Sequence, residues 1–175
     1  MGVAHMTKES LDQQWDQLRQ KYSSYLRLLE AIPADRYHTR LVPGMGTPAE
    51  LVVQMSAAIV KDIAQGVAQG GIEMDRSAEA RLLADVGTKM AVIAYAKKCW
   101  TVANEAVKRI GNAQLTAIIS TPWNMEMTGW AGFNILNDEF LHHYGQLYTC
   151  ARLCGAEPPF LWGFAESSLR YRFAD

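Results

Sequence analysis

Two acid and imidazole pairs stand close together near the C-terminal end of the sequence. Glu139 precedes His143 by four residues, and Asp138 precedes His142 by the same spacing. Residues four apart lie on one face of an α-helix, so each pair places a carboxylate beside an imidazole. Such a pair can supply two ligands to a metal ion. It can equally be structural, because a carboxylate one turn earlier satisfies the ring of a core histidine.

The helix that must carry these pairs is predicted from an apolar stripe with helical spacing. We expect it to begin near residue 128 or 130 and to end at Gly155. The stripe is made of Phe133, Leu136, Phe140, His143, Leu147, Cys150 and Cys154. Because His143 lies within the stripe and His142 lies beside it, Glu139 and His143 are the pair expected to face the protein interior.

A third ligand has to come from another helix. Thr-Pro-Ala-Glu at residues 47–50 is a clear helix start, with a cap residue, a proline at the first helical position and a glutamate three residues after the cap. An apolar seam follows and runs to a group of glycines, and Gln54 lies beside this seam. Gln54 is therefore the best candidate, although a glutamine carbonyl is a weak ligand for zinc. The candidate metal site is Gln54, Glu139 and His143.

Two more long helical patterns are present. The first covers about residues 8 to 32, and Ser10 with Gln13 forms its predicted capping box. The second follows a polar joint at residues 75–77 and continues to a Gly-Asn stop signal, either unbroken or with a break near Gly87. Both patterns have the apolar periodicity of helices that pack on one side.

The remaining stretch, residues 112 to about 128, is predicted to be extended or irregular, and no sheet is expected from it. Four long helices with no strand pattern between them predict an all-α four-helix bundle with an irregular connection before the last helix. The size of the chain suits one domain over residues 1–175. We expect its core to span about residues 8 to 162, with an aromatic C-terminal tail at residues 160–175.

Composition excludes several classes of function. Seventeen Lys and Arg residues against eighteen Asp and Glu residues give a net charge of -1 without any block of like charge, which argues against a nucleic-acid partner. The longest uncharged apolar run, residues 51–60, is about half of the ~20 residues that a membrane-spanning helix needs. No membrane span and no secretory signal are therefore expected, and the predicted location is cytoplasmic. The three cysteines are spaced for neither a zinc ribbon nor a redox pair.

Several runs of residues together resemble the pattern of one bacterial family. His-His-Tyr-Gly-Gln-Leu at residues 142–147 is followed by Arg-Leu-Cys-Gly at 152–155 and Pro-Pro at 158–159. Residues 47–54 add Thr-Pro-Ala-Glu-Leu-Val-Val-Gln on the second helix. In this combination the sequence resembles the DinB superfamily of YfiT-like four-helix bundles, over about residues 8 to 162. The resemblance implies the same fold.

The resemblance also implies a divalent ion, because the family usually holds nickel or zinc on three histidines. The matching positions here are Gln54, Glu139 and His143, of which only His143 keeps the imidazole. Characterised relatives include thiol-dependent transferases and isomerases, in which the ion binds a low-molecular-weight thiol and makes thiolate available. Tyr144 and Gln146 are near enough along the helix to orient a substrate or cofactor.

Two functions follow from the resemblance. The first is a metal-dependent thiol transferase, isomerase or hydrolase with an altered set of ligands, acting on a small molecule. The second is a non-catalytic bundle, small-molecule-binding or stress-associated, that has lost the metal. The resemblance also implies a homodimer.

Overall fold

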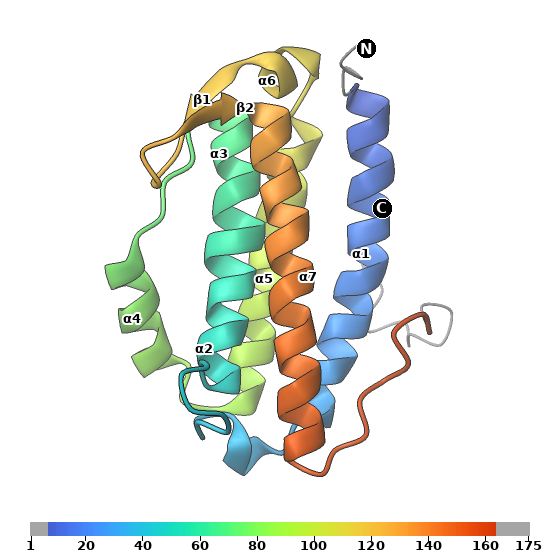
Figure 1. Ribbon diagram of the computed structural model, residues 1–175, viewed down its shortest axis with the longest axis vertical. Helices are drawn as coiled ribbons and strands as arrows, with labels where there is room; N and C mark the ends of the chain where they lie inside the picture. The colour runs from blue at the N-terminus through green and yellow to red at the C-terminus, as the bar shows by residue number, and fades with distance from the viewer. Residues whose placement is uncertain (1–6, 164–175) are drawn as a thin grey trace.

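Four long helices run side by side along the long axis of the computed structural model, which describes residues 7–163 (Figure 1). In chain order the elements are α1 (Lys8–Ala31), the 3-10 turn η1 (Ala34–Arg36), α2 (Pro48–Val53), the π-helix η2 (Gln54–Asp62), α3 (Ile63–Gln69), α4 (Arg76–Asp85), α5 (Lys89–Lys108), α6 (Asn112–Thr116), β1 (Ile118–Ser120), β2 (Glu126–Thr128) and α7 (Gly129–Leu153). The bundle consists of α1, the continuous helix α2–η2–α3, α5 and α7. The predicted all-α bundle is confirmed in its four long helices.

The first helix begins where predicted but is capped differently. Thr7 is the N-cap residue, and its side chain accepts a hydrogen bond from the Ser10 backbone N–H. The predicted capping box of Ser10 and Gln13 is therefore wrong, because Ser10 already lies inside the first turn. The helix ends at Ala31, where the residue before Pro33 takes an extended conformation, as the proline ring requires.

The second helix starts with the predicted capping box. Thr47 accepts from the Glu50 backbone N–H, and the Glu50 carboxylate accepts from the Thr47 backbone N–H. The helix is long and apolar enough to cross a membrane by composition, but 72% of its apolar window is buried inside the bundle. Packing against the other helices thus accounts for its apolar character. It ends at Gln69, and the cap residue Gly70 has a φ of +94°, the left-handed conformation that favours glycine.

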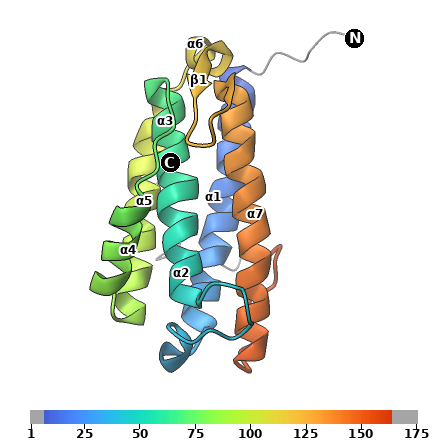
Figure 2. The same cartoon turned by 60° about the vertical axis from the view of Figure 1, so that its left-hand side comes forward.

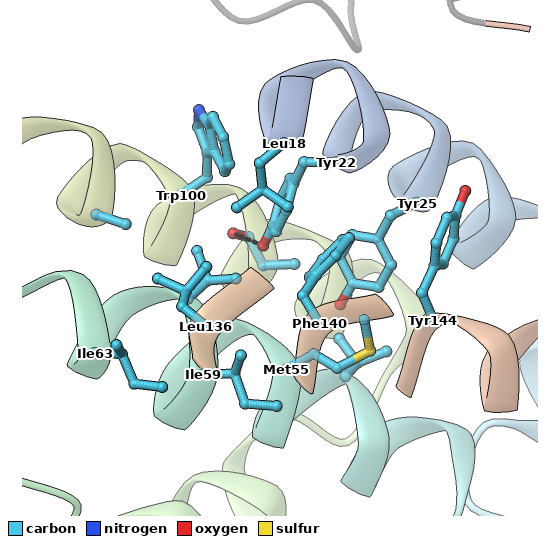
Figure 3. Close-up of a cluster of buried hydrophobic side chains, with 14 of the residues drawn as sticks. Leu18, Tyr22, Tyr25, Met55, Ile59, Ile63, Trp100, Leu136, Phe140 and Tyr144 are labelled. Atoms are coloured by element: carbon cyan, nitrogen blue, oxygen red, sulfur yellow. Dashed lines mark hydrogen bonds between the residues drawn. The ribbon is translucent and has the colours of Figure 1, made fainter. Parts of the chain in front are cut away.

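The core between the helices combines aliphatic side chains with a group of packed aromatic rings (Figure 3). The rings of Trp15 and Trp100 stack with centroids 4.5 Å apart, and the Tyr22 ring lies 4.7 Å from that of Trp100. Phe140 of α7 packs against Tyr22 and Tyr25 of α1, with centroid distances of 5.7 and 5.6 Å. The predicted seams of α1 and α7 are therefore the faces that meet in the core.

Three hydroxyl groups form a buried cluster within this core, here called the hydroxyl cluster: Tyr22, Tyr25 and Ser56. Ser56 Oγ lies 3.2 Å from the Tyr22 hydroxyl and 3.1 Å from the Tyr25 hydroxyl. The Tyr22 hydroxyl also donates to the Ala96 carbonyl oxygen at 2.9 Å. Burial raises the pKa of both tyrosines well above the ordinary value, so their hydroxyls stay protonated. The cluster ties α1 and α5 to the π-helix η2.

The connection before α7 contains a small sheet, which corrects the prediction that no sheet would form. Strands β1 and β2 pair antiparallel, with Ile119 opposite Met127. Ser120 also forms an isolated bridge with Gly71, at the end of the second helix. The β-branched run alone could not predict this sheet, because its partner strand has only three residues and the bridge to Gly71 comes from a distant part of the chain. The loop of this hairpin, residues 121–125, lies between α3 and α7 (Figure 2).

Two other expectations concern the third helical region and the tail. The break expected as one option near Gly87 is present, because α4 ends at Asp85 and α5 begins at Lys89. Of the predicted aromatic tail, residues 160–163 are described, and residues 164–175 lie outside the described residues. Phe160 is 67% exposed. Arg27 of α1 donates to the Gly163 carbonyl oxygen at 3.0 Å, and the Tyr148 hydroxyl donates to the carbonyl oxygen of Pro159, just before the segment, at 2.6 Å.

Candidate functional site

A cavity of about 650 Å³ lies between the helix α2–η2–α3 and α7. Residues of helix α4 and of the hairpin loop also line it. Figure 2 shows the loop between α3 and α7, and α4 on the other side of the helix α2–η2–α3. Most of the cavity wall is apolar. The largest apolar groups of the wall that come from the helices are Val53, Ile59, Ile63, Leu83 and Ile135. The hairpin adds Trp123, Met125 and Met127.

Two of the three predicted metal ligands line this cavity. Gln54 is the first residue of η2, and Glu139 lies in α7. Gln54 is exposed, and the Glu139 side chain is 50% exposed. The third predicted ligand, His143, is buried at 9% exposure and lies one turn further along α7, next to Glu139. The structure therefore brings the amide and the carboxylate to one cavity, with the imidazole beside the carboxylate.

Hydrogen bonds fix the orientation of the His143 ring. Its Nδ1 lies 2.8 Å from Gln146 Oε1, and because an amide oxygen only accepts, Nδ1 donates. The Gln146 amide nitrogen donates in turn to His142 Nε2 at 3.1 Å. The other ring nitrogen of His143, Nε2, lies 3.5 Å from Glu139 Oε2. In the neutral ring Nε2 is thus the atom free to bind a proton or an ion, and it faces Glu139.

The donor atoms decide whether these residues fit a divalent ion. Two ligand atoms of a tetrahedral ion with bonds of about 2.1 Å lie roughly 3.4 Å apart. The 3.5 Å between Glu139 Oε2 and His143 Nε2 is close to that separation. Within residues 7–163, however, no group of three His, Cys, Asp or Glu side chains is placed to hold an ion. The three-imidazole set implied by the resemblance does not fit this chain, whereas a mixed set of oxygen and nitrogen donors has two members in place.

Tyr144 and Gln146, the residues predicted to orient a substrate, lie on different faces of α7. Successive helical residues are turned by about 100°, so Gln146 shares the face of Glu139 and Tyr144 does not. Tyr144 is 2% exposed and packs edge-on against Tyr25, with ring centroids 6.2 Å apart (Figure 3). Neither is among the described residues that line the cavity. Gln146 supports the site through His143, and Tyr144 is a core residue.

Sequence reasoning missed the contribution of α4. Arg76, Glu79 and Leu83 line the cavity from this helix. Their spacing of three and four residues places them on one face, and this spacing was the available signal. Helix α4 has no buried residue, and therefore no apolar stripe indicates which of its faces points toward the cavity. Asp75 caps the helix by accepting from the backbone N–H groups of its first turn.

Glu79 is the carboxylate of the cavity that lacks a partner. Its Oε1 is inaccessible to solvent and accepts no hydrogen bond from the described residues. Glu50, in contrast, accepts from the Thr47 backbone N–H at 2.7 Å and from Arg40 at 3.1 Å. Burial raises the pKa of Glu79, and the nearby Asp62 carboxylate adds to this effect, whereas Arg76 and Lys61 oppose it. Glu79 also lines an adjoining, more polar cavity of about 800 Å³.

The arrangement of the helices is that of DinB-like proteins. The structure matches a DinB-like protein, YjoA from Bacillus subtilis, with a TM-score of 0.63 at 18% sequence identity, over 82% of this chain and 94% of that chain. It matches a DinB-like protein from Bacillus cereus with a TM-score of 0.68 at 18% identity, over 89% of this chain and 98% of that chain. No protein-family model and no curated protein matches the sequence. The predicted DinB-like fold is confirmed, and at this identity the likeness concerns the fold alone.

Proposed function

We propose that the chain binds a small organic molecule in the cavity between η2 and α7. The observation that carries the proposal is the composition of the lining, in which apolar walls surround a few polar groups, among them Gln54 and Glu139. Small-molecule sites have this composition, and their volumes are roughly 300–1,000 Å³. The cavity, at about 650 Å³, lies in the middle of that range.

The side chains around the cavity suit a ligand with an apolar body. Trp123 and Met125 of the hairpin are 39% and 57% exposed, so a bound molecule would cover apolar surface that now faces water. Methionine side chains adapt to irregular shapes because they are unbranched and flexible. The body of the ligand therefore packs against the hairpin and the helix walls, and its polar end faces the polar groups of the lining.

Binding of Nile red, an uncharged dye that fluoresces in apolar surroundings, tests this proposal. Ala58 lines the cavity and is 6% exposed, so Ala58→Phe fills the cavity and should weaken dye binding about ten-fold or more. Leu141→Phe is the matched control, because Leu141 lies on another face of α7 and lines a different cavity. Trp123→Ala, at an exposed position, should weaken binding without affecting folding.

Thermal unfolding and circular dichroism establish that each variant is folded. Saturable binding by the wild-type chain that Ala58→Phe reduces and Leu141→Phe preserves supports the proposal. Equal dye binding by folded Ala58→Phe and wild type, together with an unaffected Trp123→Ala, contradicts it.

A second candidate function is a metal-dependent transferase, isomerase or hydrolase that uses a low-molecular-weight thiol. The contact between Glu139 and His143 beside the cavity favours it. These two residues would hold a divalent ion such as nickel or zinc, with Gln54 as a third donor. A bound ion of this kind lowers the pKa of a coordinated water or thiol. The chain itself contributes the hydrogen bond from His143 to Gln146, which holds Nε2 toward Glu139.

Metal analysis of protein purified without chelators and then equilibrated with nickel or zinc tests this candidate. The chain offers matched controls: the exposed His142 is the neighbour of His143, and the exposed Asp138, another carboxylate, is the neighbour of Glu139. A stoichiometric ion that is lost in His143→Ala and Glu139→Ala but kept in His142→Ala and Asp138→Ala supports the candidate. An ion that survives both inner substitutions, or no binding of either metal, contradicts it.

Location and assembly belong to the same proposal. We propose a cytoplasmic protein that acts as a homodimer without a nucleic-acid or membrane partner. Sedimentation equilibrium at micromolar concentration tests the dimer, because a single species of 19.5 kDa contradicts it. Cell fractionation tests the location.

A further inference from the structure

We propose that the molecule bound in the cavity carries a cationic nitrogen, as in a primary amine attached to an apolar body, and that this nitrogen donates to Glu79. The inference rests on the proposed small-molecule function and adds the chemical class of the ligand. It starts from the charges around the cavity, where Glu50, Glu79 and Glu139 stand against one cation, Arg76.

The three carboxylates differ in whether their oxygen atoms have partners. Glu50 accepts from Arg40 and from a backbone N–H, and the Glu139 side chain is 50% exposed, so water can donate to it. Glu79 has a solvent-inaccessible oxygen, Oε1, without a hydrogen bond from any described residue. Glu79 is therefore the carboxylate at which a donor is missing.

A buried oxygen without a donor is costly, because it has lost its hydrogen bonds to water and gained none in return. Because water does not reach Oε1, the Glu79 side chain must turn toward the cavity to meet a donor from the ligand, and the bond formed there removes this cost. A charged N–H donor makes a stronger bond to a carboxylate than a neutral donor does. The Arg76 and Lys61 side chains offset the Asp62 carboxylate near Glu79, so the need for a donor comes from the burial of the Glu79 oxygen rather than from neighbouring charge.

Arg76, the cation in the cavity lining, does not favour an anionic ligand to the same extent. Arg76 is exposed, so water hydrates its guanidinium group. Its neighbour on the same face of α4, Leu83, and the adjacent Met74 provide apolar contact beside Glu79. A nitrogen at Glu79 is thus next to wall that an alkyl or aryl group can cover.

The test compares three probes with one tail and different heads: n-octylamine, n-octanol and octanoate. Each displaces Nile red from the wild-type chain at pH 8, where an alkylamine is still cationic because its pKa resembles that of lysine, about 10.4. We expect octylamine to bind about ten-fold more tightly than octanol, and octanoate to bind most weakly, since one charge-assisted hydrogen bond contributes about that factor.

Substitutions then locate the effect. Glu79→Gln keeps the size of the side chain and removes its charge, so the preference for octylamine over octanol should fall to within about two-fold. Glu73→Gln is the matched control, because Glu73 is an exposed glutamate that lines only the adjoining cavity. Arg76→Gln should strengthen octylamine binding. All three positions are at least partly exposed, so folding is not at risk.

The outcomes separate the ligand class from the proposed function. A preference for octylamine that disappears in Glu79→Gln and persists in Glu73→Gln supports the inference. Octanol binding without a preference for octylamine, a preference for octanoate, or an unchanged preference in Glu79→Gln overturns the ligand class and leaves the proposed function standing. Failure of all three probes and of Nile red overturns the proposed function itself.

Discussion

Removal of the Ser56 hydroxyl should destabilise the bundle more than its small size suggests. Ser56 is fully buried and bonds to the hydroxyls of Tyr22 and Tyr25. Ser56→Ala removes both hydrogen bonds, at about 1 kcal/mol each, and leaves the Tyr25 hydroxyl without a partner, at about 1 kcal/mol more. Tyr22 keeps its bond to the Ala96 carbonyl oxygen. The expected loss of unfolding free energy is therefore about 3 kcal/mol.

A double-mutant cycle isolates the role of the hydroxyl cluster. Tyr25→Phe alone removes one hydrogen bond and should cost about 1 kcal/mol. The double variant lacks both the serine and the orphaned hydroxyl, so it should cost only about 2 kcal/mol, which is less than the sum of the single variants. The coupling free energy of about 2 kcal/mol can be measured by urea denaturation, provided that the slopes agree.

Ser24→Ala is the control for this cycle. Ser24 is also fully buried on α1, but its hydroxyl lies outside the hydroxyl cluster and has the Tyr144 hydroxyl as its neighbour, without a well-formed hydrogen bond. Its removal should therefore cost no more than about 0.5 kcal/mol. Additive costs of Ser56→Ala and Tyr25→Phe, or an equal cost for Ser24→Ala and Ser56→Ala, would refute the reasoning.

Three further predictions concern backbone space, thiol reactivity and pH. Gly145→Ala should stabilise the chain by about 0.5–1 kcal/mol, since a Cβ there meets nothing within 4 Å, whereas Gly129→Ala should lower the melting temperature, since its Cβ would overlap a carbonyl oxygen of α6. Cys154 should react with iodoacetamide before Cys99, because Cys99 is only 1% exposed and burial raises the pKa of its thiol. Mass spectrometry that finds Cys99 modified first would contradict this. Glu79→Gln should stabilise the chain at pH 8. A carboxyl group whose pKa is higher in the folded than in the unfolded state destabilises the folded state when the pH lies above both pKa values. Denaturation curves should therefore show the gain in stability shrinking as the pH falls toward the ordinary pKa of glutamate, 4.5.

Much of the fold could be predicted from the order of residue types. The stripe on α7 placed His143 inside and His142 outside, and their burial agrees. The cap and proline at the start of α2 were equally clear, because capping is a local interaction between residues three apart. The sequence could not decide whether α4 and α5 form one helix or two, since a glycine weakens a helix without necessarily ending it.

Features made by distant segments could not be predicted in the same way. Ser120, in the hairpin that pairs Ile119 with Met127, bridges to Gly71 at the far end of another helix. Strand pairing of this kind depends on which segments the bundle brings together, and a three-residue strand has too little pattern to reveal it.

The candidate site also has features that could be predicted from single helices and features that depend on how the helices pack. The sequence determined which residues share a face of one helix, and so it paired Glu139 with His143 and set Gln54 at the edge of its own helix. Tertiary structure alone decided that Glu79 of α4 joins the cavity and that Tyr144 faces the core. The physical reason is that helical periodicity specifies which face of a helix is apolar, whereas the neighbour against that face is chosen by the packing of the whole chain.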